Sequence, residues 1–261
     1  MKLYAFAISN YCSSVKIALN YKSLSFEEIP PPDGYGSEAY KRIVPMGTIP
    51  ALRLDDDFII SESSAILEFL EENFRGHASP RLLFDDARKN AAVRFVHRLH
   101  DLYLEPPMRS LFAHMDPLVR DMSVVEQKVA MFYKRLNDLE TSRQRYISQY
   151  YEKDGNSETV FTTFDKTAPC TTSSTTFGPY FFGDQFTFAD CVLPPTLVMA
   201  DVMHRELLGK PVDYSAYPSV ATWRASVETH PAVAPVLAAA LSATEAWAEK
   251  KRGGAKSTCT L

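Results

Sequence analysis

The sequence predicts an α/β domain followed by an all-α domain, and two observations carry this expectation. Before residue 78, short aliphatic and aromatic segments alternate with helical stretches and loop signals, which is typical of strands joined by helices. After the charged residues Asp85 to Lys89, strand patterns almost disappear and apolar residues recur at helical spacing. We therefore expect domains at 1–78 and 85–250, with a flexible tail over 251–261.

The composition is that of a folded globular protein, because 46% of the 261 residues are hydrophobic. A formal net charge of −4 provides no basic footprint, so we expect neither nucleic acid nor a membrane as a partner. No stretch has the roughly eighteen apolar residues of a membrane span, and the first residues turn polar too soon for a signal peptide. These features favour a cytoplasmic protein that binds a small polar ligand.

The cysteines and histidines indicate neither a disulfide framework nor a metal. Four cysteines, at positions 12, 170, 191 and 259, are scattered without zinc-binding spacing. His97 and His100 stand three residues apart beside Asp101, but no third ligand is in view. We expect no metal site.

The first domain is expected to contain four strands and three helices. The strands are expected at Leu3–Ile8, Leu24–Ile29, Ala51–Leu54 and Phe58–Ile60. The helices are expected to start near Cys12 or Ser13, to cover Glu38–Ile43, and to follow Ser61 as an N-cap.

Two short motifs in this domain could bind a ligand. The Ile49–Pro50 bond is well placed to be cis, which would leave the Ile49 backbone free to face a neighbour. At the helix that follows Ser61, free N–H groups and the Ser63 hydroxyl would attract a carboxylate, while Glu62 could receive an ammonium group. These charges describe an amino-acid head group, although the same residues could simply cap the helix.

The second domain is expected to be helical. One apolar stripe runs from Ala92 to Tyr103 and should end or kink at Pro106–Pro107, and a second runs from Val125 to Leu139. Residues 152–177 have the composition of an inserted polar loop. Thr187 and Asp190 form a helix start signal.

The order of these signals resembles the cytosolic glutathione transferase family over nearly the whole chain. The resemblance rests on Ser9 with Val15–Leu19 behind it, on Gly47–Leu52, on Ile60–Leu67 and on Phe186–Asp190. It implies a thioredoxin-like N-terminal domain (βαβαββα), an all-helical C-terminal domain, a homodimer, and glutathione as co-substrate.

The resemblance also implies roles for individual residues. The Ile49 backbone would pair with the cysteinyl part of glutathione beside cis-Pro50, with Thr48 next to it, while Glu62 and Ser63 would hold the γ-glutamyl head group. Lys41 is a substitute for the basic or amide side chain that the family often places before the cis-proline.

Three residues compete for the glutathione sulfur. Ser9 stands where the serine-type classes place the hydroxyl that donates to the sulfur, and such a donor lowers the pKa of the thiol. Asn10 could share this contact. Cys12, near a helix N-terminus, could instead form a mixed disulfide, or it could be structural.

The resemblance places the acceptor substrate near Tyr11, Tyr103, Pro107, Met108 and Phe112, whose bulk suits an apolar electrophile, although they could equally be core. The expected function is conjugation of glutathione to such an electrophile, as in detoxification. Two alternatives remain: a glutathione-dependent thiol reductase or lyase using Cys12, and a non-catalytic ligand carrier.

Overall fold

The computed structural model describes residues 1–75, 79–151 and 178–254. The predicted inserted loop at 152–177 and the last part of the predicted tail lie outside these residues. The tail prediction is wrong at its start, because the last helix continues to Gly254. Among the described residues, no helix is both long enough and apolar enough to cross a bilayer.

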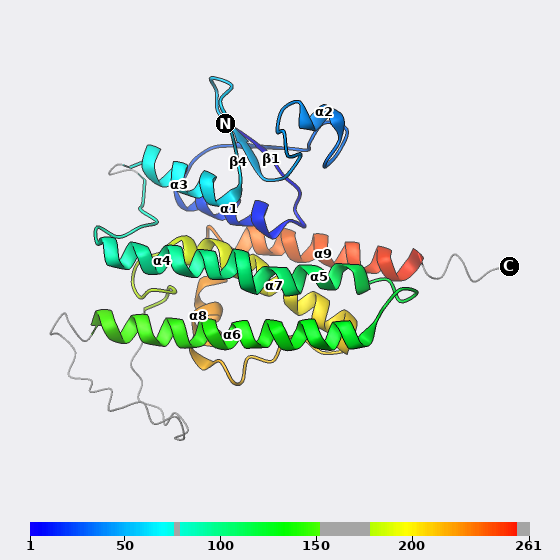
Figure 1. Cartoon of the computed structure of the whole chain (residues 1–261). Helices are drawn as coiled ribbons and strands as arrows, with labels where there is room; N and C mark the ends of the chain where they lie inside the picture. The colour runs from blue at the N-terminus through cyan, green and yellow to red at the C-terminus, as the bar shows by residue number, and fades with distance from the viewer. Residues whose placement is uncertain (76–78, 152–177, 255–261) are drawn as a thin grey trace.

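The N-terminal domain is built on a four-stranded sheet (Figure 1). Its strands are β1 (Lys2–Tyr4), β2 (Glu27–Ile29), β3 (Ala51–Arg53) and β4 (Ile59–Ser61). Their spatial order is β2-β1-β3-β4, with β1 and β2 parallel and the other neighbours antiparallel. Each strand has three residues; β1, β2 and β3 are therefore shorter than their predicted ranges, whereas β4 has the predicted length but is shifted by one residue, ending at Ser61.

Three helices accompany the sheet: α1 (Asn10–Tyr21), α2 (Glu38–Lys41) and α3 (Ser63–Asn73). Helix α1 begins at Asn10, two residues earlier than predicted, because the Ser9 hydroxyl caps it by accepting a hydrogen bond from the Cys12 N–H at 3.3 Å. It lies between the sheet and the helical domain (Figure 1), packing against α3 on one side and α7 on the other.

In its described residues, the C-terminal domain consists of helices and the loops that join them. Its elements are α4 (Ala87–Leu99), η1 (His100–Leu104), α5 (Glu105–Ser110), η2 (Leu111–His114), α6 (Met122–Tyr151), α7 (Phe188–Leu208), α8 (Pro218–Val227) and α9 (Ala234–Gly254). Instead of ending at Pro106–Pro107, the chain passes through the π-helical turn η1 into α5, whose first turn holds both prolines. Prolines are tolerated there because N–H groups at a helix start need no intrahelical partner.

The predicted start of α7 is present as a full capping box between Thr187 and Asp190. The fully buried Asp190 carboxylate also accepts hydrogen bonds from the Phe181 N–H at 2.8 Å and from the Trp223 indole at 2.7 Å. One hydrophobic core then runs through both domains, from Leu3 in the sheet to residues of α6, α7 and α8. The architecture confirms the predicted fold class.

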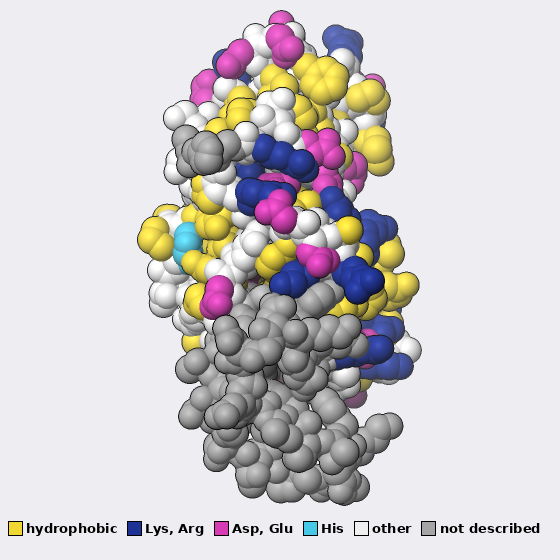
Figure 2. Space-filling view, turned by 90° about the vertical axis from the view of Figure 1, so that its left-hand side faces the viewer, with side chains coloured by type: hydrophobic (Ala, Val, Ile, Leu, Met, Phe, Trp, Pro, Cys, Tyr) yellow, Lys and Arg dark blue, Asp and Glu magenta, His cyan; other side chains and the backbone are white. Residues whose placement is uncertain are grey.

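Surface charges of both signs lie interspersed on the face shown in Figure 2. One ion pair spans the domain junction, where Arg94 on α4 donates to Glu68 on α3 at 2.7 Å.

His97 on α4 makes the stability of the fold sensitive to acid. Burial lowers its pKa from 6.5 to about 4, partly offset by the nearby Asp101 carboxylate. The unfolded chain therefore binds this proton at a higher pH than the folded chain does, so stability is lost as pH falls from about 6.5 toward 4. Between about pH 7.5 and pH 5, His97 should cost about 2 kcal/mol of unfolding free energy.

Denaturant unfolding of the wild type and of His97→Gln at both pH values measures this contribution. The wild type should lose about 2 kcal/mol more than the variant on acidification. Equal losses in the two proteins would contradict this assignment.

Candidate active site

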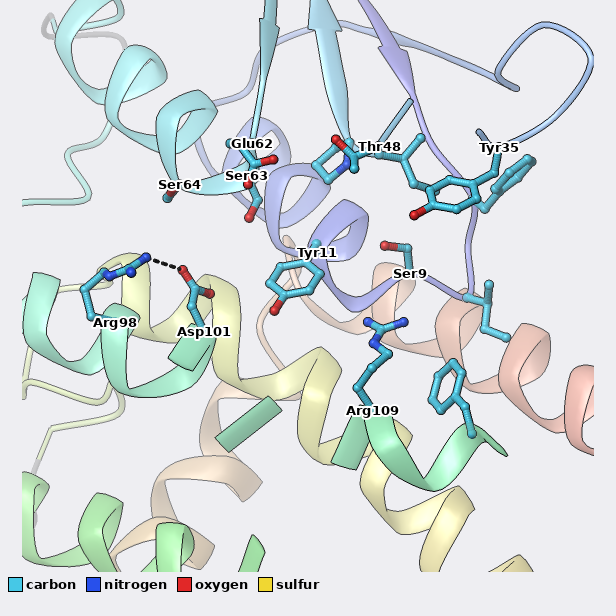
Figure 3. Close-up of a pocket in the computed structure, with 15 residues that line it drawn as sticks. Ser9, Tyr11, Tyr35, Thr48, Glu62, Ser63, Ser64, Arg98, Asp101 and Arg109 are labelled. Atoms are coloured by element: carbon cyan, nitrogen blue, oxygen red, sulfur yellow. Dashed lines mark hydrogen bonds and ion pairs between the residues drawn. The ribbon is translucent and has the colours of Figure 1, made fainter. Parts of the chain in front are cut away.

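A cavity of about 700 Å³ lies between the two domains (Figure 3). The N-terminal domain contributes Phe6, Ile8, Ser9, Tyr11, Tyr35, Thr48, Ile49, Pro50, Glu62, Ser63 and Ser64. The helical domain contributes Arg98, Asp101, Arg109 and Phe112. The hydroxyls and the turn before β3 lie on the first wall, both arginines lie on the second, and each wall contains an aromatic side chain and a carboxylate.

The turn before β3 forms one part of the first wall. The Ile49–Pro50 peptide bond is cis, and the Tyr40 hydroxyl holds the turn by donating to the Thr48 carbonyl at 2.9 Å. Within the described part of the chain, the Ile49 N–H and C=O have no backbone partner. An extended peptide could pair with them along this wall.

The start of α3 forms a second part of this wall. The Ser61 N-cap prediction is wrong, because Ser61 still pairs with Ala51 in the sheet. Glu62 is the N-cap instead, with a left-handed φ of 72°, and it makes no side-chain capping bond. The first N–H groups of α3, beside Ser63, thus remain available for an anion. The Glu62 carboxylate, one residue earlier, suits an ammonium group.

Ser9 reaches the cavity from the start of α1, and Figure 3 shows its hydroxyl beside Tyr11, below Thr48 and above Arg109. Its oxygen accepts the Cys12 N–H, and its hydroxyl proton can still donate to a group in the cavity. It is therefore a hydrogen-bond donor exposed to the cavity.

The other two candidates for the sulfur do not line the cavity. Asn10, at the first position of α1, is 1% exposed; it donates to Thr196 at 2.8 Å and accepts from Arg109 at 2.7 Å. Cys12 is fully buried, and burial raises its pKa to about 11. The structure thus buries both side chains of α1 and brings neither of them to the cavity with Ser9.

Only two of the predicted acceptor residues line the cavity, namely Tyr11 and Phe112. Pro107 and Met108 are buried, and Tyr103 is 52% exposed and lines a separate cavity of about 450 Å³ between η1 and α6. There the Arg135 guanidinium lies 5.3 Å from the Tyr103 ring centre. Tyr103, on η1, and Met108, on α5, therefore do not line the cavity between the domains.

Lys41 is also absent from the cavity lining. Its ammonium group pairs with Glu38 at 2.9 Å, and its stem packs beside Gly47. Thr48 and Tyr35 stand at this end of the cavity instead.

The charged residues of the second wall were missed by the sequence reasoning. Arg109 lies 4.8 Å from the Phe112 ring centre and 5.9 Å from that of Tyr11, and its guanidinium pairs with the buried Glu105 at 2.6 Å. Burial, followed by the charge of Glu105, raises the pKa of the Tyr11 phenol well above 10. The phenol therefore stays protonated and can donate a hydrogen bond.

The fold and the cavity together define a protein with a thioredoxin-like domain, a helical domain and a binding site between them. The Glutathione S-transferase N-terminal domain model matches residues 3–78, and the Glutathione S-transferase C-terminal domain model matches residues 108–226. These matches span most of the chain, which therefore belongs to the glutathione S-transferase family.

Relatives and solved structures agree with this assignment. The chain is 35% identical to a glutathione S-transferase of Pseudomonas putida over 127 residues, which is 46% of this chain and 56% of that protein. It is 27% identical to maleylacetoacetate isomerase of Rattus norvegicus over 223 residues, covering 84% and 83% of the two chains. The structure of glutathione transferase F7 from Populus trichocarpa shares the fold with a TM-score of 0.66 and 21% identity, covering 92% of this chain and 98% of that one. The chain spans about half the length of several of the curated relatives that it matches.

Proposed function

We propose that this protein is a glutathione transferase that activates the glutathione thiol and joins it to an electrophile. The main support for this proposal is that one cavity brings together the first N–H groups of α3, the Ile49 backbone and the Ser9 hydroxyl. These three features match the head group, the peptide backbone and the sulfur of one tripeptide.

In the proposed complex, the γ-glutamyl carboxylate lies at the α3 N–H groups and the Ser63 hydroxyl, and its ammonium group faces Glu62. The cysteinyl residue pairs with the Ile49 backbone. This arrangement directs the sulfur toward Ser9. Binding thereby places the nucleophile at a fixed position beside the acceptor wall.

The Ser9 proton would donate a hydrogen bond to the sulfur, which favours the thiolate and lowers the pKa of the thiol. The thiolate then attacks an electrophilic carbon, forming the C–S bond while the leaving group departs with its bonding electrons. With an activated alkene, the adjacent carbon instead takes up a proton from solvent.

A second candidate reaction is isomerisation of an unsaturated carboxylic acid. Arg109 favours this reaction, because it places a cation on the acceptor wall, and maleylacetoacetate isomerases are among the relatives. The thiolate would add to one alkene carbon, the new single bond would rotate, and elimination would restore both the thiolate and the alkene. The reaction involves no net oxidation or reduction, so it needs no redox partner.

Two further alternatives from the sequence receive less support. Thiol reduction through Cys12 needs an accessible thiolate, whereas Cys12 is buried with its pKa raised to about 11. A non-catalytic carrier would use the same cavity without turnover, and assay separates it from an enzyme.

Steady-state conjugation of 1-chloro-2,4-dinitrobenzene, combined with calorimetric titration of glutathione, tests the proposal. The expected result is saturable glutathione binding together with turnover above the uncatalysed rate. A Cys12→Ser control should retain both properties. Glutathione binding without turnover of this acceptor or of maleylacetone would favour the carrier, and absence of binding would reject the site.

A further inference from the structure

A buried chain of polar side chains connects two residues of the acceptor wall and has no part in the proposed chemistry. It consists of Asn10 on α1, Thr196 on α7 and His100 on η1. All three side chains are buried, whereas Arg109 and Asp101 at its two ends line the cavity. Figure 3 shows these two ends on the helical side of the cavity.

Four consecutive hydrogen bonds link these side chains from Arg109 to Asp101. Arg109 contacts the Asn10 Oδ1 at 2.7 Å, and the Asn10 Nδ2 contacts the Thr196 Oγ1 at 2.8 Å. Thr196 Oγ1 lies 2.7 Å from His100 Nε2, and His100 Nδ1 lies 2.9 Å from Asp101 Oδ1.

The chemistry of the groups gives these bonds one direction. A guanidinium group can only donate, so the Asn10 oxygen accepts and its amide nitrogen donates to Thr196. The Thr196 hydroxyl, having accepted, has its proton available for His100 Nε2. With its ring proton assigned to Nδ1, His100 accepts at Nε2 and donates to the Asp101 carboxylate. In this assignment, every bond runs from Arg109 toward Asp101.

This polarity orders the groups at both ends. Arg109 is held on the other side by the Glu105 carboxylate at 2.6 Å, so its guanidinium is fixed between two acceptors beside the Phe112 ring. Its side chain is nevertheless 40% exposed. Its contacts to Asn10 and Glu105 use Nε and Nη2, so Nη1 can donate to an anionic group bound beside the aromatic ring.

We propose that Asn10, Thr196 and His100 are positioning residues that hold Arg109 for an acceptor substrate bearing a carboxylate. This inference rests on the proposed glutathione transferase function and specifies its acceptor. Asn10 then acts on the acceptor rather than on the sulfur. The π-helical turn η1 contributes by placing the consecutive residues His100 and Asp101 at the far end of the chain.

The test compares two acceptors, 4-chloro-3-nitrobenzoate and its methyl ester, each rate being divided by the uncatalysed rate with glutathione. The wild type should prefer the carboxylate. Thr196→Val interrupts the chain without changing side-chain volume much, and it should raise the KM for the carboxylate roughly fivefold. The KM for glutathione should remain the same. Thr196→Ser restores the hydroxyl and should restore the KM.

Thr244→Val is the matched control, because Thr244 is equally buried but donates only to the Ala240 carbonyl of its own helix, at 2.7 Å. It should leave the carboxylate preference unchanged. If Thr196→Val does not fold, Asn10→Ala interrupts the next link and should raise the same KM.

Each outcome decides a different claim. A wild type that conjugates the ester but shows no preference for the carboxylate overturns the acceptor assignment. A preference that survives in Thr196→Val and in Asn10→Ala overturns the positioning role. Absence of turnover with both acceptors rejects the proposed function, and the inference with it.

Discussion

Ser9→Ala is expected to lower kcat/KM for glutathione conjugation about fiftyfold near pH 6.5, with the loss shrinking toward about pH 9. An ordinary thiol has a pKa near 8.5, so only about one in a hundred is ionised near pH 6.5. A donor that lowers the thiol pKa by about two units raises the thiolate fraction about fiftyfold near pH 6.5 and hardly at all near pH 9. A pH–rate profile of wild type and variant measures this effect.

The capping role of Ser9 needs its own control. Ser9 caps α1, and the loss of a cap costs about 1 kcal/mol of stability. Ser37 caps α2 in the same way, through the Tyr40 N–H at 3.0 Å, and it lies outside the cavity lining. Ser37→Ala should therefore destabilise the protein similarly while preserving the pH profile. A loss in Ser9→Ala that is equal at every pH would show that the hydroxyl does not act on thiol ionisation.

Lys22→Met is expected to lower the unfolding free energy by about 3–5 kcal/mol. The Lys22 and Glu71 side chains are both fully buried and pair at 2.8 Å. Lys22 also donates to the Pro80 carbonyl, and Glu71 accepts the Leu82 N–H at 3.0 Å. The pair thus holds the segment after α3 against the C-terminal end of α1. Removing the cation leaves the buried Glu71 carboxylate with only the more distant Arg81 guanidinium, at 3.6 Å, as a counter-charge.

Thermal and denaturant unfolding measure this cost, which should lower the melting temperature by roughly 10 °C. Lys2→Met is the matched surface control, since Lys2 and Glu27 pair at 3.4 Å with both side chains more than half exposed; we expect a change within about 0.5 kcal/mol. The double variant Lys22→Met/Glu71→Leu should be more stable than Lys22→Met, because it removes both charges. A small effect of Lys22→Met would show that the Glu71 charge is compensated elsewhere.

The parts of the site made by local chemistry could be predicted from the sequence. The Ile49–Pro50 turn and the capping box of Thr187 and Asp190 depend on residues close together in the chain, and the structure contains both. The start of α3 was misplaced by one residue because pairing of Ser61 with Ala51, a distant contact, extends β4. Glu62 then adopts a left-handed backbone, which a non-glycine residue rarely does.

The acceptor wall could not be predicted in the same way. The apolar pattern around Pro107 and Met108 indicated a hydrophobic surface, but which side chains face the cavity depends on the π-helical turn η1, and no periodicity announces such a turn. Arg109 stands in that same stretch and faces the cavity because Asn10 and Glu105 hold it. Asn10 is 99 positions earlier in the chain, so only the folded structure brings them together.

The hydrophobic core shared by the two domains should allow ligand binding to stabilise both of them. Since α1 packs against α3 and α7 alike, the walls of the cavity belong to one cooperative unit. A ligand present at about a hundred times its Kd would add about 2.7 kcal/mol to the stability of that unit. This added stability would extend to helices that do not contact the ligand. Hydrogen exchange in the buried part of α7 should therefore slow when glutathione binds in the cavity.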